Sequence, residues 1–191
     1  MIPAVLHFVW LGNNRIPKCD ATFMAGWKDL LPDWRIMLWT DETLPPLRNR
    51  AAFEAAAGNN TLRSDIVRHE ILLEWGGVYL DCDVEPIRSL DPLLGLHAFA
   101  CDQGRGLLGS AALGTEACNP VWAKLVAALP ESIARGGDLG TMVGPGFITP
   151  ILRGNVTELP QDVFYPYRWD EVVKPPTERT LGIHRWAGGW L

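Results

Sequence analysis

The amino-acid sequence predicts an α/β fold, in which strands alternate with helices around a parallel sheet. A short apolar run at residues 4–10 is closed by Gly12-Asn13-Asn14, as expected for a buried strand that meets a loop. A helical spacing of apolar residues follows at 21–31, and a second apolar run lies at 35–39. A strand, a helix and a second strand in this order form a βαβ unit, whose two strands lie parallel.

Strands and helices are predicted up to residue 129, and the pattern is not regular after that. We expect further elements as follows: helices at 47–57, 62–75 and 119–129, and strands at 78–80, 97–101 and 107–113. The last helix begins with Asn119 as its N-cap and a proline at its first position. Residues 136–149 are rich in glycine, which predicts a loop, and residues 160–191 show little periodicity. We expect one domain over residues 1–191, with residues 1–90 and 91–191 as its two halves.

Composition excludes several classes of protein. Of 191 residues, 48% are hydrophobic and 20% are charged, which is typical of a globular protein. The net charge is −5 and the basic residues are scattered, so we expect no nucleic-acid partner. Four cysteines without a C-x-x-C pair indicate reduced, mostly buried thiols and a cytoplasmic protein. The first residues lack the pattern of a signal peptide, and we expect no transmembrane segment.

The segment "GGVYLDCDVEPI", residues 76–87, places Asp81, Asp83 and Glu85 at alternate positions after an apolar strand. On an extended segment, such side chains point to the same side. Their mutual repulsion indicates that a cation lies between them. Carboxylates without soft ligands favour Mg²⁺ or Mn²⁺. The alternative is that these acids are a solvated strand end or turn caps.

Ligands of open α/β sheets bind beyond the carboxyl ends of the strands. The three best strands end at Trp10, at Asp41 and at Asp81 with Asp83. An aromatic ring and several carboxylates would therefore share one rim. This arrangement suits a nucleotide, with the ring on the base and a metal beside the diphosphate.

Three further groups have both a structural and a functional interpretation. Asp65 and Arg68 lie on one helix face, where they form a surface ion pair or hold ribose and a sugar. His184 is a core histidine or completes the metal shell. Trp186 and Trp190, in "GIHRWAGGW", are packing residues or close over a bound donor, helped by the glycines between them.

Five segments of the chain, taken in order, resemble glycosyltransferase family 32, the D-x-D family of sugar transferases. They are "IPAVLHFVWLG", "PDWRIMLW", "LRSDIVRHEILLEWGGVYLDCDVEP", "GPGFIT" and "HRWAGGW". The family includes yeast α-mannosyltransferases and bacterial transferases of capsular polysaccharide biosynthesis. The clostridial glucosylating toxins share the S-D-x-x-R segment ahead of D-x-D.

The resemblance implies a GT-A fold, a Rossmann-like nucleotide-binding α/β sandwich that uses a divalent metal, Mn²⁺ or Mg²⁺. Residues 1–90 would form the nucleotide-binding half with D-x-D, and residues 91–191 the acceptor side and the C-terminal closing segment. By position, Trp10 would stack on the base, while Asp65 and Arg68 would hold the ribose and the donor sugar. Asp81 would contact ribose or sugar hydroxyls and assist the metal, and Asp83 would ligate it. The resemblance thus assigns three sets: catalytic Asp81, Asp83 and Arg68; nucleotide-sugar-binding Trp10, Asp65, Arg68, Asp81, Trp186 and Trp190; and metal-binding Asp81, Asp83 and His184.

The implied activity is metal-dependent, retaining transfer of a sugar from a nucleotide-sugar donor to a hydroxyl of a glycan or a lipid-linked saccharide. A UDP-sugar is preferred over GDP-mannose as the donor. The compact chain fits a bacterial cytoplasmic enzyme, and a peripheral position at the inner membrane face is left open. Two alternatives are kept. One is a non-catalytic sugar-nucleotide-binding module, and the other is a sugar nucleotidyltransferase, for which the sequence lacks a glycine-rich triphosphate loop.

Overall fold

The structure, a computed structural model, describes residues 1–187. Its centre is a six-stranded sheet of order β2-β1-β3-β6-β5-β7. The strands are β1 (Val5–Val9), β2 (Arg35–Trp39), β3 (Gly77–Leu80), β5 (Ala98–Gly104), β6 (Leu107–Thr115) and β7 (Thr157–Leu159). A separate two-stranded sheet pairs β4 (Val84–Pro86) with β8 (Gly182–His184).

The sheet is mixed: the expectation of a parallel sheet is right for β2, β1 and β3 and for the pairing of β5 with β7, but not for β6. Strands β2, β1 and β3 run parallel, as the βαβ pattern predicts. Strand β6 runs antiparallel to both β3 and β5. The cause is local: β5 and β6 are joined by a tight turn at Arg105 and Gly106, and a short connection joins only antiparallel strands.

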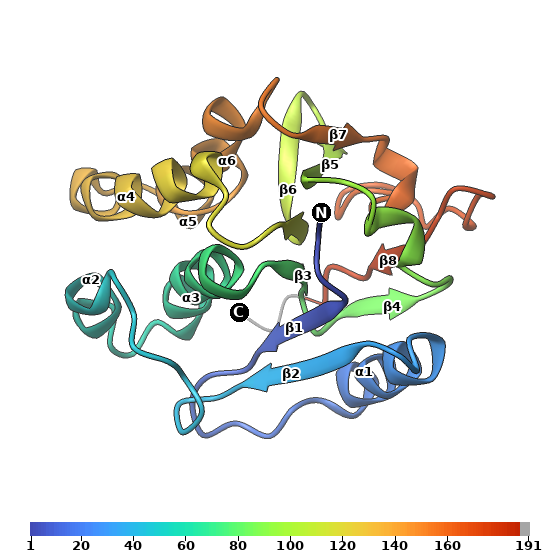
Figure 1. The fold of residues 1–191 in the computed structure, drawn as a ribbon, viewed down its shortest axis with the longest axis horizontal. Helices are drawn as coiled ribbons and strands as arrows, with labels where there is room; N and C mark the ends of the chain where they lie inside the picture. Colours follow the sequence, from blue (N-terminus) through green and yellow to red (C-terminus); the bar gives the residue numbers. More distant parts are fainter. Residues whose placement is uncertain (188–191) are drawn as a thin grey trace.

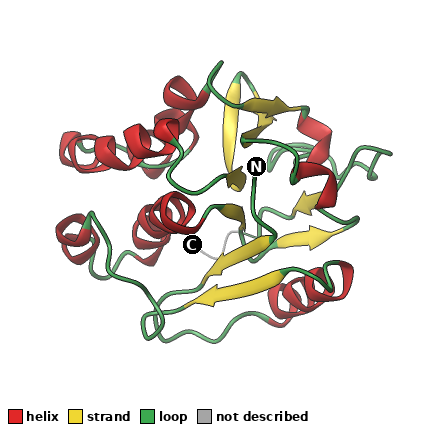
Figure 2. Cartoon of the chain, viewed as in Figure 1, coloured by secondary structure: helices red, strands yellow, loops and turns green. Residues whose placement is uncertain are grey.

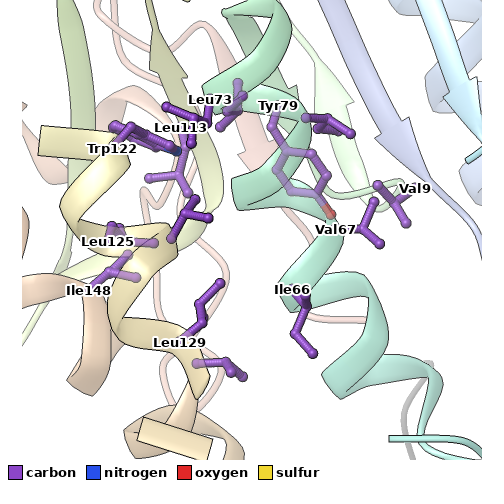
Figure 3. Close-up of a cluster of buried hydrophobic side chains, with 14 of the residues drawn as sticks. Val9, Ile66, Val67, Leu73, Tyr79, Leu113, Trp122, Leu125, Leu129 and Ile148 are labelled. Carbon is purple, nitrogen blue, oxygen red and sulfur yellow. The ribbon is translucent and has the colours of Figure 1, made fainter. Parts of the chain in front are cut away.

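Helices cover both faces of the sheet (Figures 1 and 2). They are α1 (Lys18–Leu30), α2 (Arg50–Ala55), α3 (Asn60–Trp75), α4 (Pro120–Arg135), α5 (Leu139–Met142) and α6 (Pro145–Leu152), with 3₁₀ turns η1 (Asp91–Leu93) and η2 (Gln161–Val163). In Figure 1, α2 to α6 lie to the left of the sheet, and α1 lies to its right with β4 and β8. One hydrophobic core fills each side, and Figure 3 shows part of the left one, between α3 and α4.

The second half of the chain differs from the expectations in three places. Residues 136–149 contain α5 and the start of α6 instead of a loop. Asp138 caps α5 by accepting a 2.9 Å hydrogen bond from the amide of Thr141, and Pro145 opens α6 at the first helical position. The tail also contains β8, a strand too short for a periodic pattern to reveal. The helix that begins after Asn119 runs on to Arg135, past the predicted end at 129.

The glycine pair Gly76-Gly77 turns the chain from α3 into β3. Both residues have positive φ angles, of 62° and 100°. A Cβ atom on Gly77 would lie 2.5 Å from the carbonyl oxygen of Val5, so a side chain would push β3 away from β1. This turn fixes where β3 starts and, four residues later, where the acidic segment begins.

Two smaller observations bear on the remaining expectations. All four cysteines are unbridged; Cys82 and Cys101 are buried, whereas Cys19 and Cys118 are exposed. Within residues 1–187, no helix combines the length and the apolar character needed to cross a bilayer.

Candidate active site

The two aspartates of the D-x-D segment are brought together by a turn. Strand β3 ends at Leu80, and the amide of Val84 donates a 3.0 Å hydrogen bond to the carbonyl oxygen of Asp81. The expectation of one extended segment with three aligned acids is therefore wrong. Glu85 lies beyond the turn, in β4, where it forms an ion pair with Arg185. Only Asp81 and Asp83 remain as partners for a cation.

His184 joins these two acids from the far end of the chain. Strand β8 pairs antiparallel with β4, and this register places His184 opposite Val84. Its Nε2 atom lies 3.3 Å from Oδ1 of Asp83 and 3.9 Å from Oδ2 of Asp81. One potential ligand atom from each of the three residues lies within 4.8 Å of the others. Of its two interpretations, His184 thus has the geometry of the functional one.

Hydrogen bonds orient both carboxylates. The hydroxyl of Tyr79 donates to Oδ1 of Asp81 over 2.6 Å, and an Arg68 nitrogen lies 3.2 Å from the same oxygen. The amide of Ala187 donates to Oδ2 of Asp83 over 2.9 Å. In each aspartate one oxygen is held by the protein, and the other faces His184. Burial opposes the charge of Asp83, but His184 and the Ala187 amide outweigh it and keep its pKa below the ordinary value.

These three residues fit a divalent cation. Two free carboxylate oxygens are ligands that Mn²⁺ and Mg²⁺ accept, and such ions need only one or two carboxylates when phosphate oxygens and water complete the shell. The held oxygens supply the hydrogen bonds that usually orient ligating carboxylates. The Nδ1 atom of His184 is buried without a hydrogen-bond partner, so it does not fix the tautomer of the ring.

Arg68 lies behind the acids and is buried. It forms an ion pair with Asp65 over 2.7 Å and donates to the carbonyl oxygen of Ser110 over 2.9 Å. Burial disfavours its charge, but the carboxylates of Asp65 and Asp81 outweigh burial and raise the pKa of Arg68. The pair is therefore not the exposed ion pair that the structural interpretation of these residues describes. Arg68 instead joins the helix face to the D-x-D turn.

Two neighbouring cavities lie around the D-x-D turn: Asp81 and His184 line the second, and Trp10 of the first also lines a cavity of about 30 Å³ with Asp81 and Asp83. The first has a volume of about 440 Å³ and is lined by Val9, Trp10, Leu11, Asn14, Gly58, Asn59, Asn60, Thr61, Ser64 and Leu139. The second, of about 420 Å³, contains Asp65, Arg68, Asp81, His184 and Trp186 among its lining residues. Thr61 and Leu139 line both, so the two cavities are neighbours.

The predicted aromatic residues are divided between the cavities. Trp10 follows β1, lines the first cavity and donates from Nε1 to the carbonyl oxygen of Asn14 over 2.7 Å. Trp186 lines the second cavity, with its ring centroid 4.2 Å from that of His184. Trp190 lies outside the described residues. Asp41, predicted on the same rim, instead accepts from the Gly12 amide and pairs with Arg63, and so braces the loop after β1.

Sequence reasoning missed two residues of the site. Tyr79 precedes Asp81 by two positions, and this strand spacing was the available signal. Asp20, in the first turn of α1, is buried and lines a cavity of about 30 Å³ with Asp81 and Asp83. Among residues 1–187, its carboxylate accepts one hydrogen bond, from the Cys19 thiol over 3.1 Å, and burial raises its pKa. No motif marks Asp20.

The D-x-D segment lies in a region of the chain that matches a known protein family. Residues 17–100, which include D-x-D, match the family described as "Glycosyltransferase sugar-binding region containing DXD motif". The chain belongs to the glycosyltransferases of the family 32 type. Among curated relatives of this family, inositol phosphoceramide mannosyltransferase 3 of Schizosaccharomyces pombe is 32% identical over 138 residues, which are 68% of this chain and 38% of the relative. Mannosyl phosphorylinositol ceramide synthase CSH1 of Saccharomyces cerevisiae is 29% identical over 137 residues, 68% of this chain and 35% of that protein. The chain thus spans less than two fifths of the length of either relative.

Solved structures confirm the predicted GT-A fold of this family 32-type chain. The PaToxG glycosyltransferase superposes with a TM-score of 0.71 at 16% identity, over 81% of this chain and 70% of that one. The ligand-free glycosyltransferase domain of the YGT toxin superposes with a TM-score of 0.56 at 12% identity, over 81% of this chain and 78% of that domain. At such low identities the likeness concerns the fold alone.

Proposed function

We propose that this chain transfers a sugar from a nucleotide-sugar donor to an acceptor hydroxyl, in a metal-dependent reaction that retains the donor's configuration. The observation that carries the proposal is the meeting of Asp81, Asp83 and His184 beside the second cavity, while Trp10 of the first cavity lines a small cavity together with both aspartates. A nucleotide sugar has a base, a diphosphate and a sugar in a row. The first cavity would take the base, the candidate metal ligands the diphosphate, and the second cavity the sugar.

The donor would lie across both cavities. Its base would stack on Trp10 in the first cavity, where asparagine, threonine and serine side chains offer hydrogen bonds. Its sugar would lie in the second cavity, with the carboxylates of Asp65 and Asp81 as acceptors for ribose or sugar hydroxyls. Arg68, fixed by Asp65 and the Ser110 carbonyl, would keep Asp81 in position during the reaction.

Asp81, Asp83 and His184 would hold Mn²⁺ or Mg²⁺, which supplies positive charge beside the leaving diphosphate. Tyr79 and the Ala187 amide hold the outer carboxylate oxygens and so keep the inner ones directed at the ion. The acceptor hydroxyl would attack from the face that the diphosphate leaves, and the departing phosphate oxygen would take its proton. This route needs no nucleophilic side chain.

The donor and the acceptor are inferred from the relatives as well as from the chain. Both curated relatives named above carry mannosyl and inositol phosphoceramide or phosphorylinositol ceramide in their names, which supports a mannosyl donor and a lipid-linked acceptor. Another solved relative, the YGT toxin glycosyltransferase domain, was crystallised with UDP. The preference for a UDP-sugar therefore stays a prediction, and the names of the curated relatives make GDP-mannose the donor to test beside it. The cytoplasmic location and the role in bacterial polysaccharide synthesis also stay predictions.

A donor-hydrolysis screen tests the proposal. The purified protein would be given GDP-mannose, UDP-glucose, UDP-galactose, UDP-GlcNAc and UDP-GalNAc, each with Mn²⁺ and with EDTA. We expect nucleoside diphosphate to be released from one donor with Mn²⁺ and not with EDTA. Nucleotide binding by calorimetry without turnover on any donor, with or without saccharide acceptors, would favour the non-catalytic module instead. Turnover that persists in EDTA would refute the metal dependence.

A further inference from the structure

We propose that residues 169–173 form a docking surface for a neutral lipid bilayer, from which the acceptor reaches the second cavity. This inference rests on the proposed function, because it concerns the acceptor of that reaction. It adds the surface on which the acceptor is presented and the residues that contact it. The three residues that carry it are Trp169, Val172 and Val173.

The first observation is the exposure of this loop. Among the described residues, six large hydrophobic side chains are exposed, and three of them are Trp169, Val172 and Val173, with 70%, 85% and 63% of their surfaces accessible. The other three, Met1, Leu30 and Trp75, are spread over distant parts of the sequence. Scattered exposed apolar residues are ordinary, whereas a cluster of them marks an interaction surface.

The second observation is the position of the loop at the second cavity. Trp169 and its neighbour Arg168 line this cavity together with Asp81 and His184. Figure 1 shows the segment between η2 and β8 as a long loop at the right-hand edge of the molecule. An acceptor that enters the cavity past Trp169 must pass the apolar side chains beside it. The apolar surface and the candidate chemistry thus share one entrance.

The third observation is that the loop is held in place. Arg168 is buried and makes two hydrogen bonds to Asp170, of 2.9 and 3.0 Å. The amide of Glu171 donates to the carbonyl oxygen of Arg168 over 3.0 Å, which closes a turn around Trp169. Trp169 is therefore exposed on an ordered turn. An exposed indole held in this way gains free energy when a partner covers it.

The charges around the loop indicate which kind of lipid surface fits. Asp170 pairs with both Arg105 and Arg168, and Glu171 pairs with Lys174 over 3.0 Å. The negative charges of Asp170 and Glu171 are thus neutralised by neighbouring basic side chains. The net charge of the whole chain is −5, which disfavours approach to an anionic membrane. A zwitterionic surface matches an apolar loop with paired charges.

A lipid surface accounts for more of the exposed apolar side chains of the loop than a soluble saccharide does. Val172 and Val173 are not among the residues that line the cavity, so a sugar bound there would leave them exposed. A surface that extends beyond the entrance would cover both valines together with Trp169. Tryptophan is also the side chain that most favours the boundary between lipid and water, because its ring is apolar and its N–H is polar.

Vesicle co-sedimentation tests the proposal. The protein would be mixed with phosphatidylcholine vesicles at low and at high salt. The variants are Val172→Ser/Val173→Ser, the same pair with Trp169→Ser added, and Leu30→Ser as a control that removes an exposed apolar side chain elsewhere. We expect the chain and the control to bind at both salt levels, and binding to fall on the order of tenfold in the double variant and further in the triple variant.

Each other outcome overturns the inference. Absence of binding to neutral vesicles, or binding that requires anionic lipid and is lost at high salt, would refute it. Equal binding by the triple variant would show that another surface docks. A dimer in sedimentation velocity that the double variant abolishes would assign the loop to a second copy of the chain.

A second readout separates this inference from the proposed function. Donor hydrolysis with Mn²⁺ needs no membrane, so the double variant should hydrolyse the donor at the rate of the unaltered chain. If the chain binds vesicles but hydrolyses no donor, the docking surface stands and the proposed function fails. If it hydrolyses a donor but binds no vesicle, the proposed function stands and the docking surface fails.

Discussion

The hydroxyl of Tyr79 donates a 2.6 Å hydrogen bond to Oδ1 of Asp81, two residues further along the chain. Burial raises the pKa of Tyr79 well above its ordinary value, so the phenol remains a donor at every physiological pH. The bond holds one oxygen of Asp81 and leaves the other beside His184. A side chain inside the sheet thus orients a carboxylate at its edge.

Removing this hydroxyl should weaken metal binding. We expect Tyr79→Phe to lower the affinity for Mn²⁺ by roughly 10- to 100-fold, because residues that orient a metal ligand contribute this much. Calorimetric titration with Mn²⁺ measures the effect without any need for turnover. Tyr167→Phe is the matched control, since the Tyr167 hydroxyl accepts from Arg185 and does not contact Asp81. Equal affinities in both variants would show that Tyr79 does not position Asp81.

Replacing Asp83 should abolish metal-dependent turnover without unfolding the protein. Asp83→Asn removes the charge and one of the three candidate ligands but keeps the size of the side chain. The measurement is release of nucleoside diphosphate in Mn²⁺, with the thermal midpoint as a test of folding. Glu85→Gln is the matched control, because Glu85 belongs to the same acidic segment but pairs with Arg185. Normal turnover by the Asp83 variant would disprove its role as a ligand.

Trp10→Ala should weaken nucleotide binding. Stacking of a base on an aromatic ring contributes about 1–3 kcal/mol by alanine substitution. We therefore expect the affinity for the nucleoside diphosphate of the active donor to fall on the order of tenfold or more. Trp75→Ala is the control, since Trp75 is partly exposed and lines neither cavity of the candidate site. An unchanged affinity would make Trp10 a packing residue alone.

Asp20 should contribute negative potential to the candidate metal site. Asp20→Asn removes a buried charge that lines the same small cavity as Asp81 and Asp83. We expect Mn²⁺ affinity to fall severalfold, on the order of 3- to 10-fold, because a nearby anion favours a cation. Stability should stay the same or rise, since a buried carboxylate without a cationic partner is costly. Asp29→Asn, an exposed acid on the same helix, should change neither quantity. An unaltered Mn²⁺ affinity in Asp20→Asn would contradict the prediction.

Stability should fall as the pH drops below 6.5, because of His7. Its Nε2 bonds the Gly76 carbonyl over 2.8 Å, and Trp39 donates to its Nδ1 over 3.1 Å, so only the neutral ring satisfies both partners. Burial lowers the pKa of His7 from 6.5 to about 4. In this window the unfolded chain binds a proton that the folded chain excludes. The contribution of His7 is therefore complete above pH 6.5 and is lost as the pH falls toward 4, by about 3 kcal/mol in total.

Urea unfolding at a series of pH values between 7 and 4 measures this loss. Burial also lowers the pKa of His69, to about 3, so the two histidines act in the same direction. Burial raises the pKa of Asp65 to about 6, so this carboxyl opposes the two histidines in the same window. A stability that is flat between pH 7 and 4 would show that the two histidines do not outweigh Asp65.

The first half of the fold and the order of the site along it were predictable, because local signals encode both. Apolar runs, helix caps and the glycine pair mark β1, β2, α3 and β3, and the acids directly follow β3. The second half was less predictable because some of its secondary structure forms only through contacts with distant parts of the chain. Strand β8 has three residues and exists through its pairing with β4, and no local pattern records this pairing.

The candidate site shows the same division. The aspartates were found because D-x-D is a sequence motif, but alternate spacing gave the wrong geometry. A turn, and not an extended strand, places Asp81 beside Asp83, and this turn separates Glu85 from them. Asp20 could not be found, because its approach to Asp83 depends on how α1 packs against β4. Residues that come together only through tertiary packing have no characteristic spacing in the sequence, so sequence analysis does not find them.

The pairing of β4 with β8 also sets when the protein becomes competent during synthesis. Ala187 and Asp83, joined by a hydrogen bond, are 104 positions apart. A ribosome delivers β1 to β6 and most helices long before it delivers His184, so the nascent chain can build much of its interior with only two of three candidate ligands. Contacts between such distant positions also form late, since a long loop must close first. A polypeptide cut short near residue 180 would therefore lack β8 and the third candidate ligand, His184.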